Sequence, residues 1–250
     1  MPEWPNGQVS KTLWVFIPTR VRISLLPQSG FAHELEQSSV QGAPYRACSG
    51  TGANPVPSAF ADMKTKLFQD LIWGHYRKHK RNLPWRPPHL KINKDGTLDS
   101  YRIVISEVML QQTQVPRVLQ KFPEFLKQFP SFSHLANASL ESVLRVWQGM
   151  GYNRRGKYLH ELASIVTQKY QGIIPQDPDE LKKLPGIGPA TAGSVLTFIY
   201  NKPEVFIETN IRRVFIHHFF NDSSQVHDKE IYPLIKKTLD KRNPREWYYA

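Results

Sequence analysis

The stretch LKKLPGIGPATAGSVLTFIY, residues 181–200, joins two apolar helical segments through a turn made of glycine and proline. Its pattern predicts a short helix that ends at Leu184, a sharp turn, and a second helix that begins after Gly188. Gly186 and Gly188 permit backbone angles closed to other residues, and they let the main chain approach another molecule closely. Ile187, between them, is expected to anchor the turn in the core. The N–H groups at the start of the second helix would then face an anion.

A DNA phosphate is the anion that fits this turn best, because the chain is strongly basic. Its 250 residues carry a formal net charge of +12 and a sequence pI of about 9.7. Residues 1–62 hold four basic and four acidic side chains, which cancel, so the entire net charge of +12 lies in 63–250. Such a charge favours a polyanionic partner, most often nucleic acid. A plain connection between two helices also uses glycine and proline, so the turn alone leaves a purely structural role open.

The chain divides into two kinds of sequence. Residues 1–62 are rich in proline and glycine and have no sustained period, which indicates a low-order extension outside the fold. Helical periodicity begins at Met63 and continues to the end, without a convincing alternating strand. We therefore expect an all-α domain over 63–250, with Ser139 as the N-cap of one of its helices. The loop over 83–100 is long for a compact domain, which favours a functional role.

Several classes of protein are excluded or disfavoured by the composition. The single cysteine, Cys48, rules out an internal disulfide and any all-cysteine metal site built from these residues. No other potential ligand residues accompany the histidines at a spacing typical of metal sites, so no metal site is expected. No apolar run approaches the ~20 residues needed to cross a bilayer, and the start of the chain lacks the pattern of a secretory signal. We expect a cytoplasmic protein.

Two carboxylates occur in unusual settings. Glu107 lies in an otherwise apolar helical segment, and it is followed by the polar residues 111–114. An acid on the exposed side of a helix would give the same pattern. Glu208 lies in VFIETNIRRVF, residues 205–215, between an apolar run and a basic helical segment. A helix N-terminus stabilises an acid there whether or not the acid takes part in chemistry.

Four motifs in order resemble the adenine DNA glycosylases, which remove adenine mispaired with guanine or 8-oxoguanine. They are LPWR at 83–86, SEVMLQQTQV at 106–115, WQGMGYNRR at 147–155 and LPGIGPATAG at 184–193. The resemblance covers 68–250 and places the chain in the helix-hairpin-helix DNA glycosylase superfamily, related to endonuclease III. It implies a two-lobed helical fold with the hairpin at about 179–200. It also implies base-excision DNA repair by a monomer that acts on double-stranded DNA with a mispaired or damaged base, associated with the nucleoid.

The same resemblance implies a role for each matched residue. Glu107 matches the acid that protonates the adenine ring and then helps to position water, and Glu208 matches the second carboxylate. The residues matched to DNA or base contacts are Trp85 and Arg86 beside the extruded adenine, Gln111, Gln112 and Thr113 as the wedge that fills the gap in the stack, Met150 and Tyr152 at the opposite base, and Asn210 in the motif of Glu208. Gly186 and Gly188 belong to the hairpin described above. Arg154, with Arg155 and Lys157, follows Tyr152 in the sequence and is expected to contact phosphate, although a solvated basic face would give the same pattern.

The chemistry explains why two carboxylates are needed. A base inside a duplex must be flipped out before its glycosidic bond can be reached, at a cost of a few kcal/mol that inserted side chains partly offset. Cleavage then needs a proton donor for the leaving base and a negative charge near the oxocarbenium-like sugar. Burial of Glu107 in an apolar helix would favour its neutral, donating form. A helix-capping Glu208 would remain ionised.

The chain departs from the family pattern at three places. The second carboxylate is an aspartate in the family, and the extra methylene of Glu208 can move the charge by about an ångström. Ala190 stands where bifunctional relatives carry a nucleophilic lysine, so a Schiff base is excluded and a monofunctional enzyme is expected. The four cysteines of the family's 4Fe-4S cluster would lie beyond residue 250. We therefore expect a C-terminally incomplete domain and no cofactor held by these residues.

Two alternatives remain open at this point. One is a thymine or uracil mismatch glycosylase on the same scaffold, although the sequence around Glu107 favours adenine, which offers a ring nitrogen to a general acid. The other is a non-catalytic helix-hairpin-helix module that binds DNA and has lost its chemistry through Glu208.

Overall fold

A computed structural model of the chain describes residues 58–220 and 225–250, with side chains from Lys64 onward. The expectations for residues 1–57, including the surroundings of Cys48, lie outside these ranges. Every regular element in the described ranges is a helix, which confirms the all-α fold. None of these helices has the length and apolar character needed to cross a membrane.

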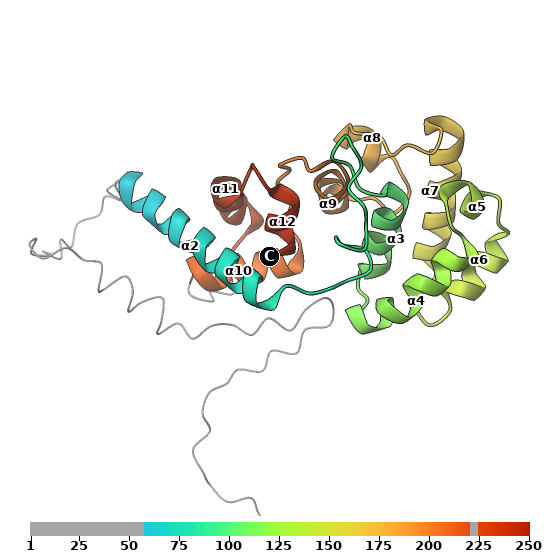
Figure 1. The fold of residues 1–250 in the computed structure, drawn as a ribbon, viewed down its shortest axis with the longest axis horizontal. Coiled ribbons are helices and arrows are strands. Elements are labelled where there is room, and N and C mark those ends of the chain that lie inside the picture. Colours follow the sequence, from blue (N-terminus) through green and yellow to red (C-terminus); the bar gives the residue numbers. More distant parts are fainter. Residues whose placement is uncertain (1–57, 221–224) are drawn as a thin grey trace, which may run out of the picture.

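The helices form two lobes (Figure 1). The first lobe contains α3 (Ser100–Leu110), α4 (Val115–Gln128), α5 (Phe132–Ala136), α6 (Leu140–Trp147), α7 (Arg154–Tyr170), α8 (Pro178–Lys182) and α9 (Pro189–Tyr200). The second lobe contains α2 (Ser58–His79), α10 (Thr209–Phe219), α11 (Asp228–Thr238) and α12 (Pro244–Tyr249).

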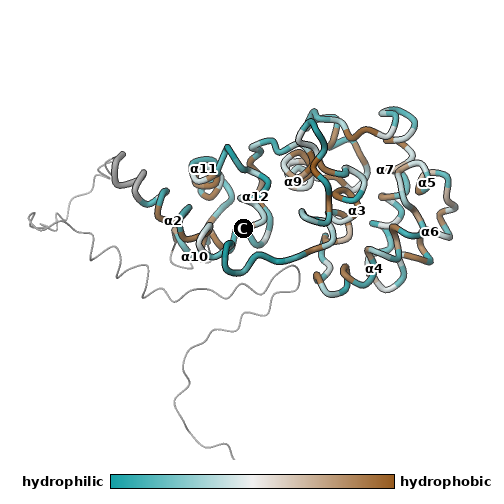
Figure 2. The backbone as a smooth tube through the Cα atoms, in the orientation of Figure 1, coloured by the Kyte–Doolittle hydropathy of each residue, from teal (hydrophilic) through white to brown (hydrophobic). Residues whose placement is uncertain are grey.

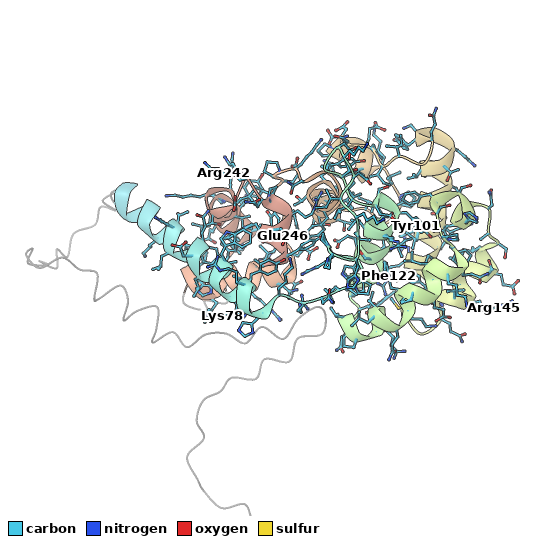
Figure 3. All side chains as sticks on the ribbon, viewed as in Figure 1. Lys78, Tyr101, Phe122, Arg145, Arg242 and Glu246 are labelled. Atoms are coloured by element: carbon cyan, nitrogen blue, oxygen red, sulfur yellow. The ribbon has the colours of Figure 1, made fainter. Side chains whose placement is uncertain are left out.

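Helix α3 lies at the centre of the first lobe and packs against α4, α7 and α9. Nearly all of its side chains are buried, as expected of a helix surrounded by others, and they include the polar Ser106 and Glu107. Figure 3 places Tyr101 of α3 and Phe122 of α4 inside this lobe. Complete burial of large side chains such as Trp147 and Phe125 stabilises the lobe by roughly 1.5–3 kcal/mol each.

The second lobe has its own smaller core, formed by Phe68 of α2, Phe215 of α10, Ile235 of α11 and Trp247 of α12. Helix α2 begins at Ser58, ahead of the predicted start at Met63. The segment SAFAD before Met63 contains neither proline nor glycine, so nothing in its sequence stops the helix there.

The connection from α2 to α3 runs from one lobe to the other, and Figure 2 shows much of it as hydrophilic. Its buried residues include Leu83, Trp85 and Leu98, which attach it to the core of the first lobe. Glu246 of α12, labelled in Figure 3, accepts a hydrogen bond of 2.6 Å from the hydroxyl of Tyr76 and pairs with Lys80 at 3.3 Å. These contacts fix the end of α2, and therefore the start of the connection, beside α12.

Local capping follows the sequence closely. Ser139 is the N-cap of α6, where its hydroxyl accepts a hydrogen bond from the N–H of Ser142, as predicted. Asp177 caps α8 in the same way through the N–H of Asp179, and Pro178 occupies the first helical position. Local residues thus define where α8, the first helix of the hairpin, begins.

Candidate active site

The hairpin between α8 and α9 has one left-handed glycine rather than two. Helix α8 ends at Lys182, two positions before the predicted end at Leu184. Gly186 has φ 79°, whereas Gly188 has φ −86° and is the N-cap of α9. A side chain at Gly188 would meet nothing within 4 Å, so open space faces the N-terminus of α9 there. Ile187 is 5% exposed and anchors the turn, as predicted.

Gln111 connects the end of α3 to this hairpin. Its Nε2 atom donates to the carbonyl oxygen of Gly186 at 3.2 Å and to the hydroxyl of Thr191 at 3.3 Å. The helix that carries Glu107 is therefore held directly against the turn that is predicted to contact DNA. Gln111 is the C-cap of α3, so its backbone position follows from the end of that helix.

Glu107 is buried between the two central helices of the first lobe. It is 6% exposed, and the hydroxyl of Ser194 in α9 lies 2.7 Å from its Oε2 atom. Ser194 is completely buried, and the sequence interpretation did not single it out. A polar residue inside the apolar segment 192–199 was the available signal, but only the packing of α3 on α9 reveals its partner.

A cavity of about 510 Å³ lies between the lobes and contains both carboxylates on its walls. The predicted site residues that line it are Trp85, Arg86, Glu107, Glu208 and Asn210. Residues that the sequence interpretation did not single out also line it, among them Arg81, Ser106, Phe198, Tyr248 and Tyr249. The structure thus brings the two carboxylates to one cavity although about a hundred positions separate them in the sequence.

Glu208 occupies the N-cap position of α10, as predicted, but its side chain makes no capping hydrogen bond. The side chain lines the cavity instead. Glutamate is one methylene longer than the residues that usually cap helices, which accounts for this difference. Asn210 follows Glu208 by two residues, and its buried Oδ1 atom has no hydrogen-bond partner among the described residues. Glu208 and Asn210 thus line the same cavity.

Arg86 and Tyr249 are in direct contact at the same cavity. The guanidinium of Arg86 lies 4.2 Å from the centre of the Tyr249 ring, and Nη1 donates to the Tyr249 carbonyl oxygen at 3.3 Å. Burial lowers the pKa of Arg86 and raises the pKa of Tyr249, so the phenol is neutral. The buried Oη of Tyr249 has no hydrogen-bond partner within the described ranges.

Trp85 has a structural position at the same cavity. Its side chain is 3% exposed and meets the ring of Phe122 edge to face, with 5.3 Å between the ring centres. It therefore forms part of the core of the first lobe as well as part of the wall of the cavity.

Two loops outside the cavity hold the residues predicted to enter the duplex. Gln112 and Tyr152 are exposed and have φ 53° and 47°, which is unusual for residues other than glycine. Thr113 and Met150 are 7% and 4% exposed, so in this structure their side chains belong to the core of the loops. Gln112 and Tyr152 thus have exposed side chains, unlike Thr113 and Met150 in the same loops.

Arg154 lies next to the hairpin. Its guanidinium is 5.1 Å from the ring centre of Tyr158, and an ideal Cβ on Gly186 would lie 3.3 Å from the Cβ of Tyr158. Arg154 is itself exposed, as are Lys182 at the end of α8 and Lys183 at its C-cap, where they pair with Asp179 and Glu180. The hairpin thus lies close in the sequence or in space to several cations, a composition that suits a phosphate.

The described residues contain no cluster of three or more histidine, cysteine, aspartate or glutamate side chains that could hold a metal ion. The full sequence has one cysteine, so these 250 residues do not supply the ligands that a 4Fe-4S cluster needs.

A helical fold with a glycine-rich hairpin and a buried acid defines a class of DNA-repair protein. The chain belongs to the HhH-GPD superfamily of base excision DNA repair proteins, whose family model matches residues 105–241. It is 38% identical over 184 residues to an adenine DNA glycosylase of Buchnera aphidicola subsp. Baizongia pistaciae, covering 73% of this chain and 49% of that protein. It is 39% identical over 160 residues to the Mycobacterium tuberculosis adenine DNA glycosylase, covering 64% and 49%.

The fold is similar to that of solved DNA glycosylases. A thermostable thymine-DNA glycosylase aligns with a TM-score of 0.65 at 22% identity, covering 76% of this chain and 84% of that one. A non-covalent endonuclease III–DNA complex aligns with a TM-score of 0.59 at 17% identity, covering 75% and 82%. These likenesses confirm the helical, endonuclease III-like fold. The chain spans about half the length of the curated relatives that it matches.

Proposed function

We propose that this protein is a monofunctional DNA glycosylase that hydrolyses the N-glycosidic bond of adenine mispaired with guanine or 8-oxoguanine. The observation that supports this most strongly is the presence of Glu107 and Glu208 on the walls of one cavity, together with Arg86 and Asn210. Relatives at 38% and 39% identity are described as adenine DNA glycosylases, which favours adenine over thymine and uracil.

The two carboxylates have different roles in the reaction. Glu107, in its protonated form, gives its proton to a ring nitrogen of the extruded adenine as the bond from the base to C1′ of the sugar breaks. The bonding electrons leave with the base, and the sugar takes on oxocarbenium character. Glu208 supplies negative charge on the sugar side. Water then adds to C1′ and returns a proton to Glu107, which restores the enzyme.

The surroundings of the cavity support binding of an extruded base. Arg86, Asn210 and Tyr249 line the cavity, and they are residues of the kinds that hydrogen-bond to the edge of a base. No lysine lies among the described residues that line the cavity, and Ala190 cannot form a Schiff base. Hydrolysis without strand cleavage follows from this chemistry.

We further propose that the protein acts as a monomer on double-stranded DNA, in the cytoplasm and in association with the nucleoid. The charge of +12 and the exposed cations beside the hairpin support a phosphate-dominated interface. Affinity for duplex DNA should therefore fall steeply as salt increases.

One panel of substrates tests this proposal. The purified protein is incubated with duplexes that contain A opposite 8-oxoguanine, T opposite G and U opposite G, and abasic sites are then cleaved with alkali. Cleavage after alkali of the adenine-containing duplex is expected, with none before alkali. Cleavage of the T:G or U:G duplex alone would show that the excised base is the mispaired thymine or uracil and not adenine. Salt-sensitive binding without base release would indicate a non-catalytic module.

A further inference from the structure

Arg155 lies in the first turn of α7, and its Nη1 atom caps the end of α3. Nη1 donates to the carbonyl oxygens of Val108 at 3.1 Å and Met109 at 3.2 Å, and also to that of Gln111. The last carbonyls of a helix have no partner within the helix, and they carry partial negative charge. A guanidinium at this end is therefore favourable, and it fixes the point where the helix of Glu107 becomes the following loop.

The other terminal nitrogen of Arg155 reaches a second loop. Nη2 donates to the carbonyl oxygens of Met150 at 3.0 Å and Gly151 at 3.2 Å, and to the hydroxyl of Thr113 at 2.9 Å. The Thr113 hydroxyl in turn lies 3.3 Å from the Met150 carbonyl oxygen. One planar side chain thus joins two loops that are separated by almost forty positions in the sequence.

The acceptors of Arg155 flank the two residues with unusual backbone conformations. Gln111 and Thr113 lie on either side of Gln112, and Gly151 directly precedes Tyr152. Gln112 has φ 53° and Tyr152 has φ 47°. A left-handed conformation is unfavourable for residues with a side chain, and it persists where the surrounding structure determines it. The guanidinium of Arg155 donates hydrogen bonds to residues directly adjacent to both of them.

We propose that Arg155 is a positioning residue that holds Gln112 and Tyr152 as one rigid unit, ready to enter the duplex beside an extruded nucleotide. This inference rests on the proposed function. Extrusion leaves a gap in the base stack, and loops ordered in advance do not lose conformational entropy at that moment. A guanidinium can span both loops because its donors form a fixed fork, whereas the ammonium of lysine is a single point.

The first test measures amide hydrogen exchange of the free protein, so it needs no DNA and no activity. Arg155→Lys is compared with Arg145→Lys, which changes an exposed arginine paired with Glu141 at the outer edge of α6 (Figure 3). Exchange in segments 110–114 and 149–153 should rise about tenfold or more in Arg155→Lys and stay at the wild-type level in Arg145→Lys. An increase in only one segment, or in neither, would overturn the inference.

The second test separates extrusion from bond cleavage. Single-turnover excision is measured on a duplex with adenine opposite 8-oxoguanine and on the same duplex with the adenine in a single-nucleotide bulge, where it is already unstacked. Arg155→Lys should slow excision of the paired adenine by roughly 10- to 100-fold and that of the bulged adenine by much less. Equal losses on both substrates would show a general structural defect and contradict the positioning role.

Two controls keep the outcomes distinct. If Arg155→Lys does not fold, Thr113→Val removes the hydroxyl that Arg155 and Met150 share, and exchange should still rise in both segments. If the wild-type protein releases no base from either duplex, the proposed function is wrong. The exchange measurement would still show whether Arg155 holds the two loops together. Unchanged exchange in Thr113→Val together with an unfolded Arg155→Lys would count against the inference.

Discussion

The hydroxyl of Ser194 lies 2.7 Å from Oε2 of Glu107, and this contact joins the second helix of the hairpin to the helix that carries the acid. The same hydroxyl lies 3.0 Å from the carbonyl oxygen of Thr191. A serine hydroxyl has one proton and two lone pairs. It can therefore donate to an ionised Glu107, or donate to Thr191 and accept from a protonated Glu107. Either state of the acid finds a partner without movement of the backbone.

Replacement of this serine should slow base excision, while the free energy of unfolding falls only slightly. Ser194→Ala is expected to slow single-turnover base excision by roughly tenfold, because Glu107 loses a positioning hydrogen bond, and to lower the free energy of unfolding by about 1 kcal/mol. Ser164→Ala is the matched control, since its hydroxyl bonds to the His160 carbonyl within α7, away from the cavity. Equal rates in the two variants would show that Ser194 is only a packing residue.

Glu208→Asp tests whether the site is built around glutamate. Aspartate at an N-cap commonly accepts a hydrogen bond from the second or third N–H of its helix, so the shorter side chain should turn toward α10 and away from the cavity. We expect the free energy of unfolding to rise by about 0.5–1 kcal/mol while excision slows by up to about a hundredfold. Faster excision in Glu208→Asp would instead identify the natural glutamate as an impaired version of the family residue.

The two glycines of the hairpin should respond differently to alanine. Gly186→Ala places a side chain at φ 79° and 3.3 Å from Tyr158, so it should destabilise the fold by roughly 1–3 kcal/mol. Gly188→Ala meets no protein atom within 4 Å and should cost less than about 1 kcal/mol, yet it should weaken duplex binding because its methyl group occupies the approach of a phosphate. Thermal unfolding and titrations at several salt concentrations measure both effects. Unaltered binding by Gly188→Ala would remove the hairpin from the DNA interface.

The ion pairs that hold α8 against α7 predict a defined acid transition. Glu180 bonds to Lys183 at 2.5 Å, to the Tyr170 hydroxyl at 2.5 Å and to Lys169 at 3.0 Å, and these partners lower its pKa from 4.5 to about 2. A depressed pKa contributes stability above about pH 4.5, and that stability is lost as the pH falls toward 2. Glu180→Gln should therefore unfold at a lower temperature than the wild type at pH 7 and at nearly the same temperature at pH 2. A difference that persists at pH 2 would mean that charge is not its source.

Much of the fold could be predicted from the sequence, because it is encoded in local signals. The hairpin at 181–200 has its own turn residues and apolar helices, and the Ser139 cap needs only its own helix. The family resemblance likewise singles out Glu107, and its apolar neighbours in the sequence predict its burial. In contrast, the start of α2 ahead of Met63 was missed, because a gradual change in composition does not fix where a helix begins.

The missing parts of the site depend on contacts between distant segments. Ser194 meets Glu107 only because α3 packs on α9, and Tyr249 reaches Arg86 only because α12 returns to the first lobe. Neither residue has a recognisable spacing from its partner in the sequence. Glu208 precedes α10 as predicted, whereas the lack of a capping hydrogen bond from its side chain depends on its surroundings and has no signal in the sequence. Tertiary packing, rather than pattern, determines these features.

The most direct test of the account compares Glu107→Gln with the wild type on a duplex that contains adenine opposite 8-oxoguanine. Glutamine has nearly the shape of glutamate and can still meet the Ser194 hydroxyl, but it cannot give a proton to the base. The wild type should release adenine, and Glu107→Gln should bind the same duplex with similar affinity and release adenine more slowly by about a thousandfold or more. Release at the wild-type rate by Glu107→Gln, or no release by the wild type, would contradict the assignment of this cavity as a glycosylase active site.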